Sequence, residues 1–181
     1  MSKNDARENG RLEAAGDRWR LRFTRRLAHS PEKVWRALTE PEHLKAWFPD
    51  DIEGTFERGG VIRFVSEYRP NSRFEGEVIE FDPPSVLEFR WDTNETLRFE
   101  IRPDGAGAVL TFLDTFDELG KAARDAAGWH ACLDVLTYDL DGAIPPWEPG
   151  GHWNELHHGY IERLGPAASQ IGPPAEHPYV T

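Results

Sequence analysis

Apolar and charged residues alternate along much of the first two thirds of the chain. The alternation is clearest over residues 76–91, where Leu87, Phe89 and Trp91 are separated by single charged residues and an Asp-Pro-Pro-Ser sequence at 82–85 interrupts the pattern. A period of two is typical of half-buried strands. Because proline cannot donate a hydrogen bond to a strand ladder, the interruption predicts a turn between two antiparallel strands.

The same pattern predicts about seven strands. The first covers residues 18–28, where Trp19, Leu21 and Phe23 face one side and arginines face the other, as solvated residues that discourage edge pairing. An antiparallel sheet with one apolar face needs a cover on that face. The remaining strands are expected at residues 52–56, 61–68, 74–81, 86–91, 97–101 and 108–116.

Helical spacing predicts the cover. Over residues 118–140 apolar residues recur every three or four positions, which indicates one long amphipathic helix. Two short helices are expected before the second strand. Ser30-Pro31 is a typical helix start, with serine as N-cap and proline at the first helical position, and Pro41 begins a second helix that reaches Trp47-Phe48. A further helix is predicted at 152–164.

These elements divide the chain into four parts. Residues 1–17 are polar and are expected to form a disordered tail, and residues 18–142 form one domain. Residues 143–164 are a C-terminal extension whose helix packs on that domain. The Gly/Pro/Ala-rich residues 165–181 are expected to be a flexible tail.

Composition excludes several classes of protein. Cys132 is the single cysteine, so an internal disulfide is excluded, and the first residues lack the apolar segment of a signal peptide. No apolar run approaches the length of a membrane span, and we therefore expect a cytoplasmic protein. The net charge is -11, and residues 37–181 hold eleven Lys/Arg against twenty-seven Asp/Glu. Such an acidic body argues against a nucleic-acid partner.

The sequence shows no motif for nucleophilic catalysis, phosphate binding or dinucleotide binding, and we predict no catalytic residue and no cofactor. His130 is a possible base or polar anchor, but a helix histidine more often bonds to a backbone carbonyl or water. Glu155 and His158 have a spacing that metal sites use, near His152 and His157. One such pair is weak, so no metal site is expected.

The order of strand, two short helices, six strands and a long helix resembles the START-like helix-grip fold. Several segments look like the SRPBCC superfamily, in the branch of homologues of the activator of the heat-shock-protein-ninety ATPase. They are Ser30 to Glu42, Trp47-Phe48, Gly59-Gly60, the Gly76-x-Val78-x-Glu80 to Trp91 block, and Gly128-Trp129-His130-x-x-Leu133. The resemblance covers residues 19–164 and implies an α+β fold, in which a curved seven-stranded antiparallel sheet grips helix 118–140.

The resemblance also implies a pocket between the sheet and the long helix, lined by inward strand residues and by the helix. Assigning the inward face by parity is essential, because a slip of one residue would move every strand position to the opposite face. By position, the matching residues are Trp47, Phe64, Tyr68, Phe74, Phe89, Trp91, Phe99, Phe112, Trp129, His130 and Leu133.

Three functions remain open at this stage. The first is binding of a small apolar or amphipathic molecule, which the aromatic content favours. The second is protein interaction, co-chaperone-like or as a homodimer, with Trp147 and Trp153 as a possible surface. The third is a polyketide cyclase or aromatase activity that would use polar groups such as His130, Tyr68 and Arg73.

Overall fold

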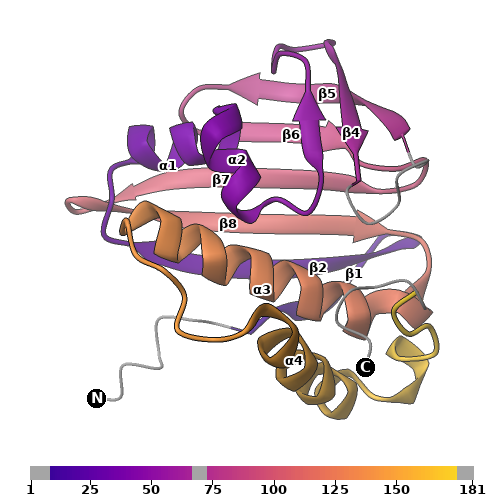
Figure 1. Ribbon diagram of the computed structural model, residues 1–181. Helices are drawn as coiled ribbons and strands as arrows, with labels where there is room; N and C mark the ends of the chain where they lie inside the picture. Colours follow the sequence, from indigo (N-terminus) through magenta and orange to yellow (C-terminus); the bar gives the residue numbers. More distant parts are fainter. Residues whose placement is uncertain (1–8, 67–72, 175–181) are drawn as a thin grey trace.

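An eight-stranded antiparallel sheet curves around one long helix in the computed structural model, which describes residues 9–66 and 73–174 (Figure 1). This confirms the α+β helix-grip fold, with one strand more than the sequence predicted. The spatial order is β1-β2-β8-β7-β6-β5-β4-β3. The strands are β1 Arg11–Ala15, β2 Arg18–Leu27, β3 Asp51–Glu53, β4 Val61–Val65, β5 Arg73–Asp82, β6 Val86–Arg90, β7 Thr96–Asp104 and β8 Gly107–Phe116.

Within the described residues four α-helices accompany the sheet: α1 Pro31–Thr39, α2 Pro41–Trp47, α3 Ala122–Leu140 and α4 Pro149–Leu164. Helix α3 lies across the concave face of the sheet, with α1 and α2 beside it, and α4 packs along α3 on the side away from α1 and α2 (Figure 1). The side chain of Ser30 accepts a hydrogen bond from the Lys33 amide, which confirms the predicted start of α1. No helix of the described residues is long and apolar enough to cross a membrane.

The first seventeen residues need a correction. Residues 11–15 were expected in a disordered tail, but they form β1 and pair with β2 in antiparallel register. Leu12 is the only large apolar residue of this strand, so its alternation is weak. Its order comes from pairing: Arg22 of β2 forms an ion pair with Glu13 at 3.0 Å. A short edge strand that is stabilised by pairing with its neighbour need not show a clear alternation of apolar and polar residues.

The described part of the C-terminal tail is also structured. A short 3₁₀ helix spans Pro166–Ala168, and Ala168 is buried. The amide of Ile171 donates a hydrogen bond to the carbonyl of Gly120 at 2.9 Å. Residues 165–174 therefore run back against the turn that precedes α3, where a flexible tail was expected.

Strand parity sets what faces α3. Along β8 the buried inward positions include Phe112, Asp114 and Phe116, and along β2 they include Arg25. The inward face thus carries two charged side chains among apolar ones. The alanines at the start of α3 are buried, and their small side chains let the helix approach its neighbours closely.

Candidate functional site

Aromatic side chains from the sheet, from the end of α2 and from α3 meet between the two layers. We call this group the inner aromatic cluster. Each ring contacts at least one other ring of the group at a centroid distance of 4.7 to 6.3 Å. Its members are Trp47, Phe48, Phe56, Phe64, Phe74, Phe89, Trp91, Phe99, Phe112 and Trp129.

Trp129 of α3 joins the helix to the sheet. Its ring centroid lies 4.9 Å from that of Phe112, 5.0 Å from that of Trp91 and 5.8 Å from that of Phe48. On the sheet itself, Phe99 and Phe112 are paired across β7 and β8 with centroids 4.7 Å apart. These are distances of direct ring contact, so aromatic side chains fill the space between the sheet and α3.

Two indole groups of the cluster bond to buried carboxylates. Trp91 donates its Nε1–H to Asp50 Oδ2 at 3.2 Å, and Trp129 donates its Nε1–H to Asp114 Oδ2 at 3.1 Å. Asp50 is 7% exposed and Asp114 is fully buried. The cluster therefore offers apolar rings with a carboxylate beside Trp91 and another beside Trp129, whereas the indole of Trp47 donates to the backbone carbonyl of Ala37.

The two ends of the cluster differ in burial. The rings over the centre of the sheet are buried, whereas Phe56, Phe74 and Trp91 are half-buried. These three come from the segment before β4, the start of β5 and the end of β6. The half-buried end of the cluster therefore lies beside β4, β5 and the end of β6.

The structure brings together most of the residues that the sequence predicted. Phe48 and Phe56 belong to the cluster although neither was predicted as a pocket residue. Phe56 was expected at the end of a strand at 52–56, but β3 ends at Glu53, and Phe48 follows the last residue of α2. Leu133 is buried in the same core, and Tyr68 lies outside the described residues. The predicted residues in ring contact are Trp47, Phe64, Phe74, Phe89, Trp91, Phe99, Phe112 and Trp129.

His130, predicted among the pocket residues, lies outside the inner aromatic cluster, where α3 meets β2 and α4. Its ring lies edge-on to Phe23 of β2 and to Tyr160 of α4, with Nδ1 2.8 Å from the Tyr160 hydroxyl. That hydroxyl also accepts a hydrogen bond from the Gly10 amide at 2.7 Å. The histidine thus ties α3 to α4 and to the N-terminal segment.

Next to His130, Asp134 is the centre of a buried polar group. Its carboxylate lies 3.6 Å from the Arg25 guanidinium, 3.7 Å from His130 Nε2 and 2.9 Å from His152 Nε2. Arg25 and Asp134 are 2% and 1% exposed. These residues come from β2, α3 and α4, so the group joins the three elements at the back of α3.

The histidines of the C-terminal extension do not meet at one point. His152 bonds to Asp134 and stacks on Trp147, whereas His157 stacks on Trp153 with centroids 4.6 Å apart. Trp153 is buried against the domain, so it does not supply the exposed interaction surface considered from the sequence.

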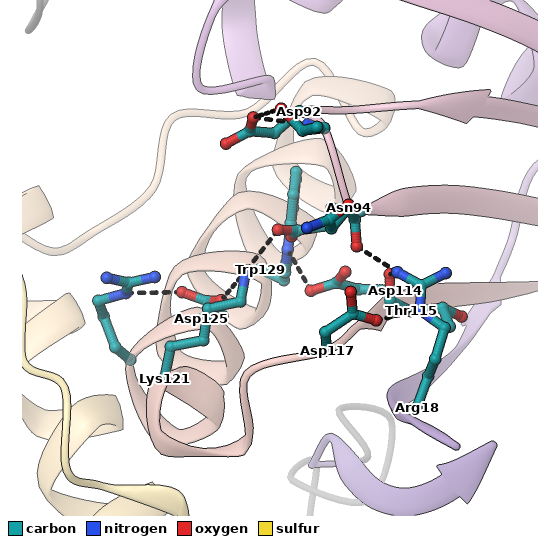
Figure 2. A network of polar contacts seen from close by, with 12 residues as sticks. Arg18, Asp92, Asn94, Asp114, Thr115, Asp117, Lys121, Asp125 and Trp129 are labelled. Atoms are coloured by element: carbon teal, nitrogen blue, oxygen red, sulfur yellow. Dashed lines mark hydrogen bonds and ion pairs between the residues drawn. The ribbon is translucent and has the colours of Figure 1, made fainter. Parts of the chain in front are cut away.

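A second polar group lies behind Trp129, and Figure 2 shows its surroundings. Asp114 of β8, Asp125 of α3 and Glu95 of the loop before β7 face one another, and Lys121 forms ion pairs with Glu95 and Asp125. Burial, and then the charges of Glu95 and Asp125, raise the pKa of Asp114 well above its usual value. Burial and the charge of Asp125 also raise the pKa of Glu95.

Two hollows on the described surface lie away from the aromatic cluster. One, of about 350 Å³, is polar and open, and Glu95 forms part of its wall. The other, of about 90 Å³, lies along β1 and β2. The lining of the first hollow is Asp17, Arg18, Arg90, Thr93, Asn94, Glu95, Thr96 and Asp117.

Cys132 is expected to react slowly with alkylating reagents. Burial, and then the charges of Asp50 and Asp134, raise the pKa of its thiol to about 12. Because only the thiolate reacts, iodoacetamide at pH 8 should alkylate it at least about 100-fold more slowly than a peptide cysteine. Timed mass spectrometry measures the rate, and unfolding in urea should restore the ordinary rate. Rapid labelling of the folded protein would contradict the expectation.

Comparison with known proteins agrees with the fold described above. The model of the family described as Activator of Hsp90 ATPase homolog 1-like protein matches residues 28–140. No curated protein sequence matches at a significant level.

Solved structures share the fold at low identity. A conserved protein of unknown function from Enterococcus faecalis has 23% identity and a TM-score of 0.70, over 86% of this chain and 90% of that one. CalU16 from Micromonospora echinospora has 20% identity and a TM-score of 0.67, over 87% and 98%. A Bordetella parapertussis protein has 21% identity and a TM-score of 0.65, over 90% and 94%.

Proposed function

The chain belongs to the Activator of Hsp90 ATPase homolog 1-like family, and from that premise we propose that it binds a small apolar or amphipathic molecule at the inner aromatic cluster. The observation that supports the proposal is the kind of side chains that lie between α3 and the sheet. Sheet and helix meet there through aromatic rings, with the Asp50 and Asp114 carboxylates beside the two tryptophans. An apolar wall with a few placed polar groups is typical of small-molecule sites.

The ligand enters at the half-buried end of the cluster. Because the rings touch one another, a ligand must replace ring–ring contacts with its own. Phe74 and Trp91 are the rings best placed to give way, since both are half-buried and their centroids lie 6.2 Å apart. A flat apolar molecule recovers the lost contacts by stacking against Trp129 and Phe48.

Asp50 gives the site a polar preference. Its Oδ2 accepts the Trp91 indole N–H at 3.2 Å, so movement of Trp91 frees an acceptor at the edge of the cluster. Loss of one hydrogen-bond donor from a buried carboxylate raises the free energy of the folded protein. The Asp50 carboxylate therefore favours ligands that carry a hydrogen-bond donor at one end.

The other functions have less support in the contacts. A cyclase-type activity would use His130, Tyr68 and Arg73. His130 faces α4, Arg73 is exposed, and Tyr68 lies outside the described residues. An interaction surface at Trp153 is incompatible with the burial of that side chain.

Binding is tested with N-phenyl-1-naphthylamine, a neutral fluorescent probe that carries one N–H donor. Wild-type protein should bind it with a dissociation constant in about the micromolar range. The double variant Phe74→Ala, Trp91→Ala should bind at least about 10-fold more weakly, because it removes the two edge rings.

The matched control is Trp147→Ala, since Trp147 is also half-buried but packs on Tyr138 and His152 in the extension. It should leave probe affinity unchanged. Equal loss of affinity in both variants, or no binding by the wild-type protein, would refute the proposed site. Native mass spectrometry of the protein purified without added ligand then gives the mass of a co-purified molecule.

A further inference from the structure

Asp114 and Glu95 form a pair of buried carboxyl groups next to Trp129. Asp114 is fully buried and Glu95 is 6% exposed. No N–H or hydroxyl group of the described residues donates to Asp114 Oδ1 or Glu95 Oε1, and the two side chains hydrogen-bond to each other. Because ionised carboxylates are acceptors only, this hydrogen bond requires a proton on one of the two groups.

The charges around the pair lead to the same proton. Lys121 forms ion pairs with Glu95 and Asp125, and Arg124 pairs with Asp125 at 2.7 Å. Two cations thus face three carboxyl groups, so the group is neutral when one carboxyl group is protonated. An unpaired charge inside a protein is strongly unfavourable, and the shared proton avoids it.

Asp114 is the member of the pair that holds the proton. The second oxygen of Glu95 accepts the ammonium of Lys121, which favours ionised Glu95. Asp114 forms no ion pair with a cation of the described residues, and its cross-strand neighbours are Leu21 of β2 and Leu97 of β7. Burial, and then the charge of Glu95, raise the pKa of Asp114 well above its usual value.

The pair is connected to the inner aromatic cluster through Trp129. Asp114 Oδ2 accepts the Trp129 indole N–H at 3.1 Å (Figure 2), which leaves Oδ1 for the bond to Glu95. Loss of the proton would place two carboxylates side by side and draw water from the polar hollow, whose wall includes Glu95. Trp129 would then move away from Phe112, and a ligand in the cluster would lose a stacking partner.

We propose that Asp114 is a positioning residue of the ligand site: it donates a proton to Glu95 and so holds Trp129 against the inner aromatic cluster. The effect on the ligand rests on the proposed function, whereas the proton does not. Besides Glu95, the charged groups nearest to Asp114 are Lys121, which favours ionisation of Asp114, and Asp125, which opposes it. Ligand binding therefore weakens as the pair ionises.

Infrared spectroscopy tests for the proton without any ligand. A protonated carboxyl group absorbs apart from carboxylates, so its band should be present in the wild-type protein near neutral pH and absent from Asp114→Asn. Glu42→Gln is the control: Glu42 is exposed, and this variant should keep the band. Absence of the band from the wild type, or its persistence in Asp114→Asn, would overturn the proposal.

Two amide substitutions identify which residue holds the proton. Asp114→Asn can keep both hydrogen bonds, because the amide oxygen accepts from Trp129 and the amide nitrogen donates to Glu95. Glu95→Gln removes the charge that pairs with Lys121, so it should lower the melting temperature more than Asp114→Asn does. The opposite order, or failure of Asp114→Asn to fold, would contradict the assignment.

The link to the ligand site is tested by titrating N-phenyl-1-naphthylamine between about pH 6 and about pH 10. Wild-type affinity should fall at least about 10-fold over this range, because ionisation of Asp114 displaces Trp129. Asp114→Asn should flatten the profile, and Glu42→Gln should not. Wild-type binding that is independent of pH would refute the link. Absence of binding at every pH would instead refute the proposed function, and the infrared band would then decide on the proton alone.

Discussion

Replacing Arg25 with methionine is expected to lower the free energy of unfolding by about 3–5 kcal/mol. Arg25 is 2% exposed on the inward face of β2, and its guanidinium lies 3.6 Å from the carboxylate of Asp134, which is 1% exposed. Methionine fills similar volume without the charge. The carboxylate then stays buried without the counter-charge of Arg25, beside His152 Nε2 at 2.9 Å and His130 Nε2 at 3.7 Å.

Arg22→Met on the same strand is the matched control. Arg22 is half-exposed and pairs with Glu13 at 3.0 Å, so its loss should cost less than about 1 kcal/mol. Urea unfolding followed by circular dichroism measures both variants. Equal losses of stability for the two arginines would show that the buried pair has no special role.

Gly76→Ala is expected to destabilise the protein by at least about 3 kcal/mol. A Cβ atom on Gly76 would lie 1.9 Å from the backbone oxygen of Arg90 and 2.9 Å from the ring of Phe64. The first neighbour is backbone and cannot turn aside, so β5 would have to separate from β6. That movement would disturb the half-buried end of the inner aromatic cluster.

Gly159→Ala in α4 provides the comparison for this glycine. A Cβ atom there meets nothing within 4 Å, and alanine favours the helix by up to about 1 kcal/mol. Thermal unfolding of the two variants should therefore give shifts of opposite sign. Stability of Gly76→Ala equal to that of the wild type would contradict the close approach of β5 and β6.

Most of the aromatic cluster could be predicted from the sequence because strand parity and burial are linked. Once Phe89 is assigned to the inward face, alternation also places Trp91 there, and the same reasoning applies to Phe99 and Phe112. Phe48 and Phe56 were missed because the predicted helix and strand extended over them, whereas both residues lie in connecting segments. Their contacts depend on how α2 and the segment before β4 pack on the sheet.

His130 shows where periodicity fails. The helical stripe of 118–140 predicts which residues are buried, and His130 is buried as expected. However, α3 is covered on one side by the sheet and on another by α4. A stripe of apolar residues does not tell which neighbours a buried residue meets. His130 was predicted with the pocket residues, and it contacts Phe23 of β2 and Tyr160 of α4.

The inward position of the two buried charged residues could have been predicted from strand alternation. In the predicted strand 108–116 the parity that places Phe112 inward also places Asp114 inward, and in 18–28 it places Arg25 inward. A charged residue on a buried face needs a partner. The partners themselves, Asp134 for Arg25 and Glu95 and Asp125 for Asp114, depend on tertiary packing and could not be read from spacing.

The most direct test of the central claim uses the indole N–H signals of the seven tryptophans in a ¹⁵N correlation spectrum. N-phenyl-1-naphthylamine is titrated into labelled protein, with signals assigned by single Trp→Phe variants. If the probe binds at the inner aromatic cluster, the signals of Trp91 and Trp129 should move, because their N–H groups bond to Asp50 and Asp114, while those of Trp19 and Trp147 should not. Movement of Trp147 with Trp91 and Trp129 unchanged, or no movement at a saturating concentration of probe, would contradict it.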